Sequence, residues 1–129
     1  MGGEAVDILL VEDEQDARRA FSEILGLEGY SVAGARNGEA ALAMLREGTR
    51  PALILLDLNM PVLDGWGFLR EIEQDASLAQ VPIAFISGTG LPQSVPTRKH
   101  DAGFFKKPVD MPRLLRMVRS YCGERESKD

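Results

Sequence analysis

Residues 53–61 read Leu-Ile-Leu-Leu-Asp-Leu-Asn-Met-Pro, so that four aliphatic side chains lead directly into an aspartate. A run this short, and apolar without alternation, is typical of a strand that is buried on both faces, as in a parallel sheet. Pro61 ends regular structure, and residues 62–65 are typical of a turn. We therefore expect Asp57 at the carboxyl end of a central strand, the edge where open α/β sheets bind their ligands.

Short apolar segments alternate with amphipathic ones on both sides of this strand. The apolar segments predict four further strands, at residues 7–11, 31–35, 83–86 and 104–106. Apolar residues at helical spacing predict helices at about residues 17–25, 39–46, 65–75 and 111–121. Residues 91–101 should hold one more helix, but Pro92 and Pro96 predict that it is short or irregular. Five strand–helix units with short connections indicate an α/β fold with a parallel sheet and helices on both faces.

The 129 residues are enough for one domain with a hydrophobic core and too few for two. We expect a single domain over residues 1–129, with its folded core at about residues 7–121. No apolar run is long enough to span a membrane, and the single cysteine, Cys122, fits a reducing compartment, so we expect a cytoplasmic protein. The net charge of −5 argues against general nucleic-acid binding.

Polar side chains of different kinds lie at the ends of four predicted strands. They are Glu12 and Asp13 after the first, Asp57 at the third, Ser87 after the fourth and Lys107 after the fifth. Three carboxylates that meet at one edge repel each other, and Mg²⁺ relieves this repulsion while it still binds phosphate oxygens. A lysine and a hydroxyl add the positive charge and hydrogen bond that assist phosphoryl transfer to an aspartate.

Four segments carry a resemblance to a known family. They are VEDE at residues 11–14, LDLNMPVLDG at 56–65, ISG at 86–88 and FFKKP at 104–108. In this order and spacing they resemble the signature blocks of the receiver domain of bacterial two-component response regulators, in the single-domain form of the chemotaxis regulators. The resemblance implies a flavodoxin-like, doubly wound sheet of five parallel strands in the order 2-1-3-4-5, with five helices.

The resemblance also implies how the acidic residues act. Asp57 would accept a phosphoryl group from a phosphohistidine on a sensor histidine kinase or a histidine phosphotransfer protein. Asp13 and Asp57 would bind Mg²⁺ directly, with Mn²⁺ as a substitute, and Glu12 would act mainly through a water molecule. The backbone carbonyl of Asn59 would be a further metal ligand.

The same resemblance assigns roles near the last two strands. Lys107 would contact the phosphoryl oxygens, and Ser87 would turn toward the phosphoryl group. Phe104 would swing inward as Ser87 moves, and the changed surface would bind a downstream protein target. Such a domain is a signalling module and not an enzyme, because it assists only its own phosphorylation and dephosphorylation. We expect no membrane or nucleic-acid partner, and a monomer or weak homodimer.

Three other functions compete with this interpretation. A receiver-like scaffold that works without phosphorylation is the first, and the intact set of site residues argues against it. An aspartate-nucleophile phosphatase needs a second acid two residues after the nucleophile, where Asn59 stands. A flavin-binding module would need a phosphate-binding loop after the first strand, where the acids at residues 12–14 would repel a phosphate.

Overall fold

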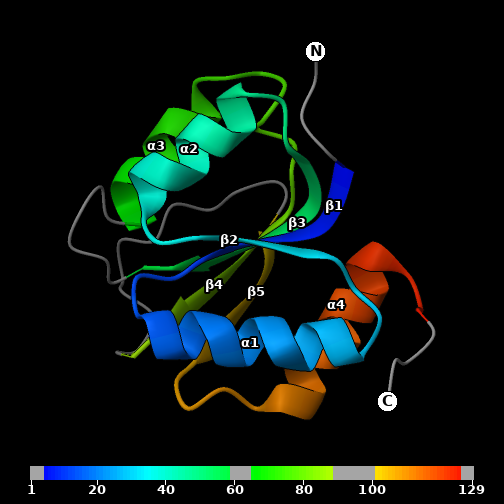
Figure 1. Ribbon diagram of the computed structural model, residues 1–129. Coiled ribbons are helices and arrows are strands. Elements are labelled where there is room, and N and C mark those ends of the chain that lie inside the picture. Colours follow the sequence, from blue (N-terminus) through cyan, green and yellow to red (C-terminus); the bar gives the residue numbers. More distant parts are fainter. Residues whose placement is uncertain (1–4, 59–64, 89–100, 126–129) are drawn as a thin grey trace.

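The computed structural model describes residues 5–58, 65–88 and 101–125. These residues form one parallel sheet in the order β2-β1-β3-β4-β5 (Figure 1). The strands are β1 (Ala5–Val11), β2 (Val32–Ala35), β3 (Arg50–Asp57), β4 (Ile83–Ser87) and β5 (Asp101–Lys106). The helices are α1 (Gln15–Leu27), α2 (Gly38–Arg46), α3 (Gly65–Glu73) and α4 (Met111–Cys122). The predicted α/β class and strand order are confirmed.

The central strand β3 is buried on both faces, as its unbroken aliphatic run predicts. Residues 53–56 are fully buried and alternate between the two sides of the sheet. Ile54 and Leu56 belong to one apolar cluster, whereas Leu53 and Leu55 belong to the other. A strand covered on both faces gains nothing from alternation with polar residues, which explains the sequence pattern.

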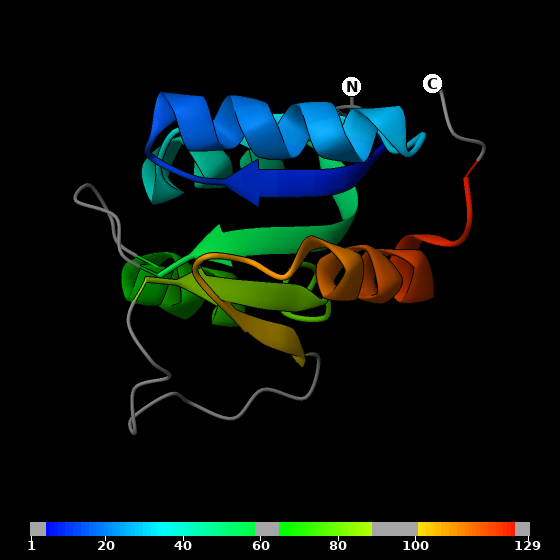
Figure 2. The same cartoon turned by 90° about the horizontal axis from the view of Figure 1, so that it is seen from below.

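Two pairs of helices cover the two faces of the sheet. Figure 2 shows α1 and α4 in front of the strands, with α2 and α3 behind them. The buried apolar residues of α2 and α3 that pack on the first face are Ala41, Leu42, Leu45, Phe68, Leu69 and Ile72. Those of α1 and α4 on the other face are Leu25, Leu114 and Val118. Each helix therefore turns one apolar stripe inward, which is the usual way in which amphipathic helices stabilise a sheet.

Side chains next to the helix ends determine where two of the helices begin. The Asn37 side chain accepts a hydrogen bond of 2.7 Å from the Ala40 amide at the start of α2. The Asp110 side chain accepts one of 3.2 Å from the Arg113 amide at the start of α4, with Pro112 in the first turn. Both residues satisfy an amide that has no partner within the helix.

The expectation of five helices is borne out only in part, since the described residues form four. Residues 91–100 of the remaining predicted helix lie outside the described residues. Asp101, placed in that helix from the sequence, instead begins β5, which is three residues longer than residues 104–106. Its first residues pair with Ile83 and Ala84 of β4 across a register shift. Backbone pairing with a buried neighbour thus extends the strand over residues that lack a strand-like pattern.

No helix of the described residues has the length and hydrophobicity to cross a bilayer.

Candidate functional site

Three acidic side chains converge at the carboxyl edge of the sheet. β1 and β3 are neighbours whose register aligns Val11 with Leu56, so the residues that follow on each strand meet. Carboxylate oxygens of Glu12, Asp13 and Asp57 lie within 4.8 Å of one another. Glu12 and Asp57 are each only 2 % exposed, while Asp13 is exposed. The site is therefore a buried acidic pair with a third carboxylate at its opening.

Lys107 reaches the same edge from the end of β5. Its Nζ atom lies 3.2 Å from Oδ2 of Asp57 and 3.4 Å from Oε1 of Glu12. The backbone amide of Lys107 donates a hydrogen bond of 2.8 Å to the Ser87 carbonyl, which ties this residue to the end of β4. The Lys107–Pro108 bond that follows is cis. A partly exposed ammonium thus lies against two buried carboxylates.

Ser87 is the last residue of β4, and Phe104 lies in the second half of β5. Ser87 is 1 % exposed and follows Ile86, the residue that pairs with Asp57 across β3 and β4. Phe104 is half-buried and packs against the apolar cluster beneath α2 and α3. Asn59, predicted to offer its carbonyl to a metal, lies outside the described residues. Ser87 is therefore next to Asp57 in the sheet, and Phe104 lies one strand further.

Burial and mutual repulsion change the ionisation of this cluster. Burial raises the pKa of Glu12 to about 7, and its hydrogen bond and charge repulsion with Asp57 act in the same direction. The Glu14 amide, 3.2 Å from Oε2 of Glu12, and the Lys107 charge oppose this rise in pKa. Burial lowers the pKa of Lys107, but the hydrogen bond to Asp57 and the two carboxylate charges outweigh it and raise the pKa. The ammonium therefore stays charged, while Glu12 is about half protonated near pH 7.

The donor set suits a hard divalent cation. All three side chains offer carboxylate oxygens close enough together to be shared by one ion. Mg²⁺ prefers oxygen ligands and binds few protein carboxylates, keeping other positions for water or phosphate oxygens. A cation would also remove the repulsion that raises the pKa of Glu12. The residues present therefore fit Mg²⁺.

Two arginines near the site were not found from the sequence. Nη1 of Arg18, in α1, donates a hydrogen bond of 2.8 Å to the backbone carbonyl of Glu12. Nη2 of Arg113, in α4, donates one of 3.0 Å to the Phe104 carbonyl, and its guanidinium lies 4.2 Å from the centroid of the Phe105 ring. Arg18 thus holds the backbone of a cluster residue, and Arg113 holds the backbone of the strand that leads to Lys107. Their spacing in the sequence matches any exposed helical arginine, so no local signal could identify them.

Comparison with known proteins agrees with this geometry. The family model for the response regulator receiver domain matches residues 8–119. The polar-differentiation response regulator DivK of Brucella anthropi is 28 % identical over 120 residues, covering 91 % of this chain and 96 % of the relative.

Solved structures show the same similarity. Chemotaxis protein CheY4 of Vibrio cholerae is 26 % identical with a TM-score of 0.76, covering 92 % of this chain and 99 % of that one. Response regulator TrrA of Thermotoga maritima, in complex with Mg(2+)-BeF, is 27 % identical with a TM-score of 0.77. That similarity covers 90 % of this chain and 98 % of TrrA.

Proposed function

The chain belongs to the family of response regulator receiver domains, and we propose that Asp57 accepts a phosphoryl group from a phosphohistidine in a reaction that requires Mg²⁺. The observation that carries the proposal is the position of Asp57, buried beside Glu12 and Asp13 with the Lys107 ammonium at 3.2 Å. Asp57 ends the central strand, which pairs with a neighbour on each side, so its backbone position is fixed by the sheet. Phosphoryl transfer depends mainly on such positioning and on stabilising negative charge.

The transfer step needs a nucleophile and a stabiliser of charge. A carboxylate oxygen of Asp57 would attack the phosphorus in line, forming an oxygen–phosphorus bond as the phosphorus–nitrogen bond of the phosphohistidine breaks. The electron pair of the broken bond would stay on the leaving imidazole. Lys107 would place its ammonium against the phosphoryl oxygens, and Ser87 would donate a hydrogen bond to them.

We propose that Asp13 and Asp57 bind Mg²⁺ directly, that Glu12 contributes through a water molecule and that Asn59 offers its carbonyl. When bound, the ion would neutralise charge on the transferred group. The complex of the relative TrrA with Mg(2+)-BeF supports this assignment. Mn²⁺ would substitute, because it has the same preference for oxygen ligands.

The donor would be a sensor histidine kinase or a histidine phosphotransfer protein, and the output a contact with a downstream protein. Added phosphoryl charge beside Asp57 would favour a conformation in which Ser87 turns toward it and Phe104 moves inward. The surface near β5 and α4 would then change its affinity for the partner. The domain would act on no substrate other than its own aspartyl phosphate.

Intact mass spectrometry after incubation with acetyl phosphate and Mg²⁺ tests this function. We expect the wild type to gain one phosphoryl group, which hydroxylamine removes because an acyl phosphate reacts with nucleophiles. Asp57→Asn should gain none, whereas Asp16→Asn, a change at an exposed α1 carboxylate, should behave as the wild type. Absence of the gain in the wild type would instead favour a scaffold that works without phosphorylation.

A further inference from the structure

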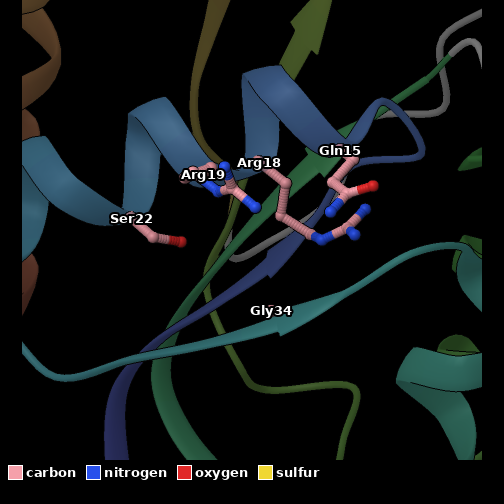
Figure 3. Close-up of a pocket in the computed structure, with 5 residues that line it drawn as sticks. All are labelled: Gln15, Arg18, Arg19, Ser22 and Gly34. Carbon is pink, nitrogen blue, oxygen red and sulfur yellow. The ribbon is translucent and has the colours of Figure 1, made fainter.

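An open pocket lies between α1 and the edge strand β2, and no residue of the acidic cluster lines it. Its volume is about 250 Å³, and its lining residues are Gln15, Arg18, Arg19, Ser22 and Gly34 (Figure 3). The four α1 residues are spaced i, i+3, i+4 and i+7, which places them on one side of the helix. None of the described acidic residues lines this pocket. Its lining is therefore polar and cationic, unlike the phosphorylation site.

The pocket has room because Gly34 has no side chain to fill it. This glycine is an exposed residue of β2, and within the described part of the chain this strand pairs only with β1. A Cβ atom built at Gly34 would lie 3.2 Å from Cδ and 3.4 Å from Cγ of Arg18. The Arg18 side chain thus runs directly over the glycine backbone, and a larger residue there would displace it. Figure 3 shows its guanidinium beside the Gln15 side chain, above β2.

Arg18 is held in place by a hydrogen bond to the backbone. It is half-buried, and the one hydrogen bond that its side chain donates among the described residues, of 2.8 Å, goes to the Glu12 carbonyl. A guanidinium has five N–H donors, so several stay available. Neither Arg18 nor Arg19 forms an ion pair with a carboxylate in the part of the chain that the structure describes. The pocket is therefore lined by two positively charged side chains that form no ion pair among the described residues.

The acids of α1 lie next to one of the two arginines, because Asp16 is three residues before Arg19 and Glu23 is four residues after it. Asp16 and Glu23 are seven residues apart, so they share a stripe, about 100° around the helix from Gln15 and Ser22 at roughly 100° per residue. Both are exposed and their charge is screened by water. Arg18 lies roughly 140–160° around the helix from both acids, so its charge is the one that they affect least.

We propose that this pocket binds the phosphate group of a small soluble molecule. Guanidinium forks bind phosphate oxygens in pairs, and the Gln15 amide and Ser22 hydroxyl add neutral donors. Pockets for drug-sized ligands hold roughly 300–1,000 Å³, so this smaller one suits a phosphate with at most a short organic part. The proposal is independent of phosphorylation at Asp57, because the two sites share no lining residue.

Amide chemical shifts measured during titration with inorganic phosphate and with glycerol 2-phosphate test the proposal. EDTA is present, so that no divalent cation brings phosphate to the acidic cluster. We expect saturable shifts at the Gln15, Ser22 and Gly34 amides with either compound, and none with acetate at the same ionic strength. Saturation by inorganic phosphate alone would overturn the part of the proposal that allows a short organic part in the pocket.

Two variants separate charge from shape. The double change Arg18→Gln with Arg19→Gln should weaken binding at least about tenfold, the effect of losing about 1.4 kcal/mol from charged hydrogen bonds. Gly34→Val keeps both charges but fills the space, and should weaken binding as much. Gly34→Ala is the milder form if valine perturbs the strand. Arg116→Gln removes an exposed α4 arginine and should leave binding unchanged.

Shifts that do not saturate, or that persist in both variants, would overturn the proposal and indicate general attraction of anions to arginines. Asp57→Asn distinguishes the two sites. It should lose the mass gain from acetyl phosphate yet keep the shifts at Gly34. Loss of the Gly34 shifts in Asp57→Asn would place the phosphate at the acidic edge and refute a separate pocket.

Discussion

The ammonium of Lys107 lies 3.2 Å from Oδ2 of Asp57, although 50 residues separate the two in the chain. Asp57 is buried at the end of the central strand, and Lys107 follows the edge strand two positions away in the sheet. The same ammonium lies 3.4 Å from Glu12. One partly exposed cation therefore balances part of the charge of two buried acids, and the site is sensitive to its removal.

Lys107→Ala should slow phosphorylation by acetyl phosphate on the order of 100-fold, because one preorganised charge stabilising the transferring group is lost. It should also lower the free energy of unfolding at neutral pH by about 1–2 kcal/mol, a value reduced because the ammonium is partly exposed. Lys106→Ala, at an exposed neighbour, is the control. The rate of mass gain and urea unfolding measure both effects. Equal rates in the two variants would refute the role of Lys107.

Stability without divalent cations should fall as the pH rises from about 4.5 to about 7. The pKa of Glu12 rises from 4.5 to about 7 on folding, so the folded state binds more protons than the unfolded state across this window. The stabilisation present below pH 4.5 is lost through pH 7, by about 3 kcal/mol. Urea unfolding in EDTA at pH 5 and pH 8 measures this loss.

Glu12→Gln is the matched variant for that pH dependence. It removes the titrating group at nearly the same size, so the difference in stability between pH 5 and pH 8 should shrink. Adding Mg²⁺ at pH 8 should stabilise the wild type, because an ion that binds only the folded state shifts the equilibrium. The same pH difference in both proteins would show that other groups cause it.

Gly103→Ala should destabilise the protein by about 1–3 kcal/mol. Gly103 has a φ of +142°, which side chains rarely adopt, and a Cβ atom would lie 3.3 Å from the Phe105 ring. Gly26→Ala is the opposite control, because Gly26 lies within α1 and, apart from the helix's own nearby backbone and the two adjacent residues, nothing lies within 4 Å of the added carbon. It should stabilise the helix by about 0.5–1 kcal/mol. Similar unfolding free energies for both variants would contradict the strain at Gly103.

Tyr30→Phe should cost about 1 kcal/mol of stability. The buried Tyr30 hydroxyl donates a hydrogen bond of 2.7 Å to the Gly123 carbonyl, which joins the end of α4 to the start of β2. Tyr121→Phe changes the same atom on a residue that is 41 % exposed and should have little effect. Unfolding midpoints in urea compare the two. A loss in Tyr121→Phe as large as in Tyr30→Phe would mean that the Tyr30 hydrogen bond contributes no specific stability.

Much of the fold follows from local pattern. The aliphatic runs of β1, β3 and β4 and the apolar stripes of the helices predict their elements, because burial requires a period that the sequence shows. The first part of β5 was missed, since Asp101 and Gly103 have no strand-like pattern and join the sheet only by pairing with β4. The caps of α2 and α4 are also local, because Asn37 and Asp110 each bond an amide three residues along the chain.

The sequence predicts which residues form the candidate site and which strand ends carry them. It does not predict which of their atoms are in contact. Placing Glu12, Asp57 and Lys107 at the carboxyl ends of parallel strands already brings them to one edge. The structure adds which oxygens face the ammonium and which carboxylates are buried. The anchoring of Glu12 by Arg18 and of Phe104 by Arg113 depends on how helices pack over strands, which no local spacing encodes.

The sequence by itself determined the alternating strands and helices, the buried central strand and the chemical character of the residues at its end, because these depend on local propensity and hydrophobic period. Only the tertiary structure decided which residues touch. Side chains that are distant in sequence produce the close contact between Lys107 and Asp57 and the raised pKa of Glu12. They also produce the cationic pocket over Gly34. Such contacts depend on the register of the strands and on where α1 packs against the sheet, and both are set by long-range packing.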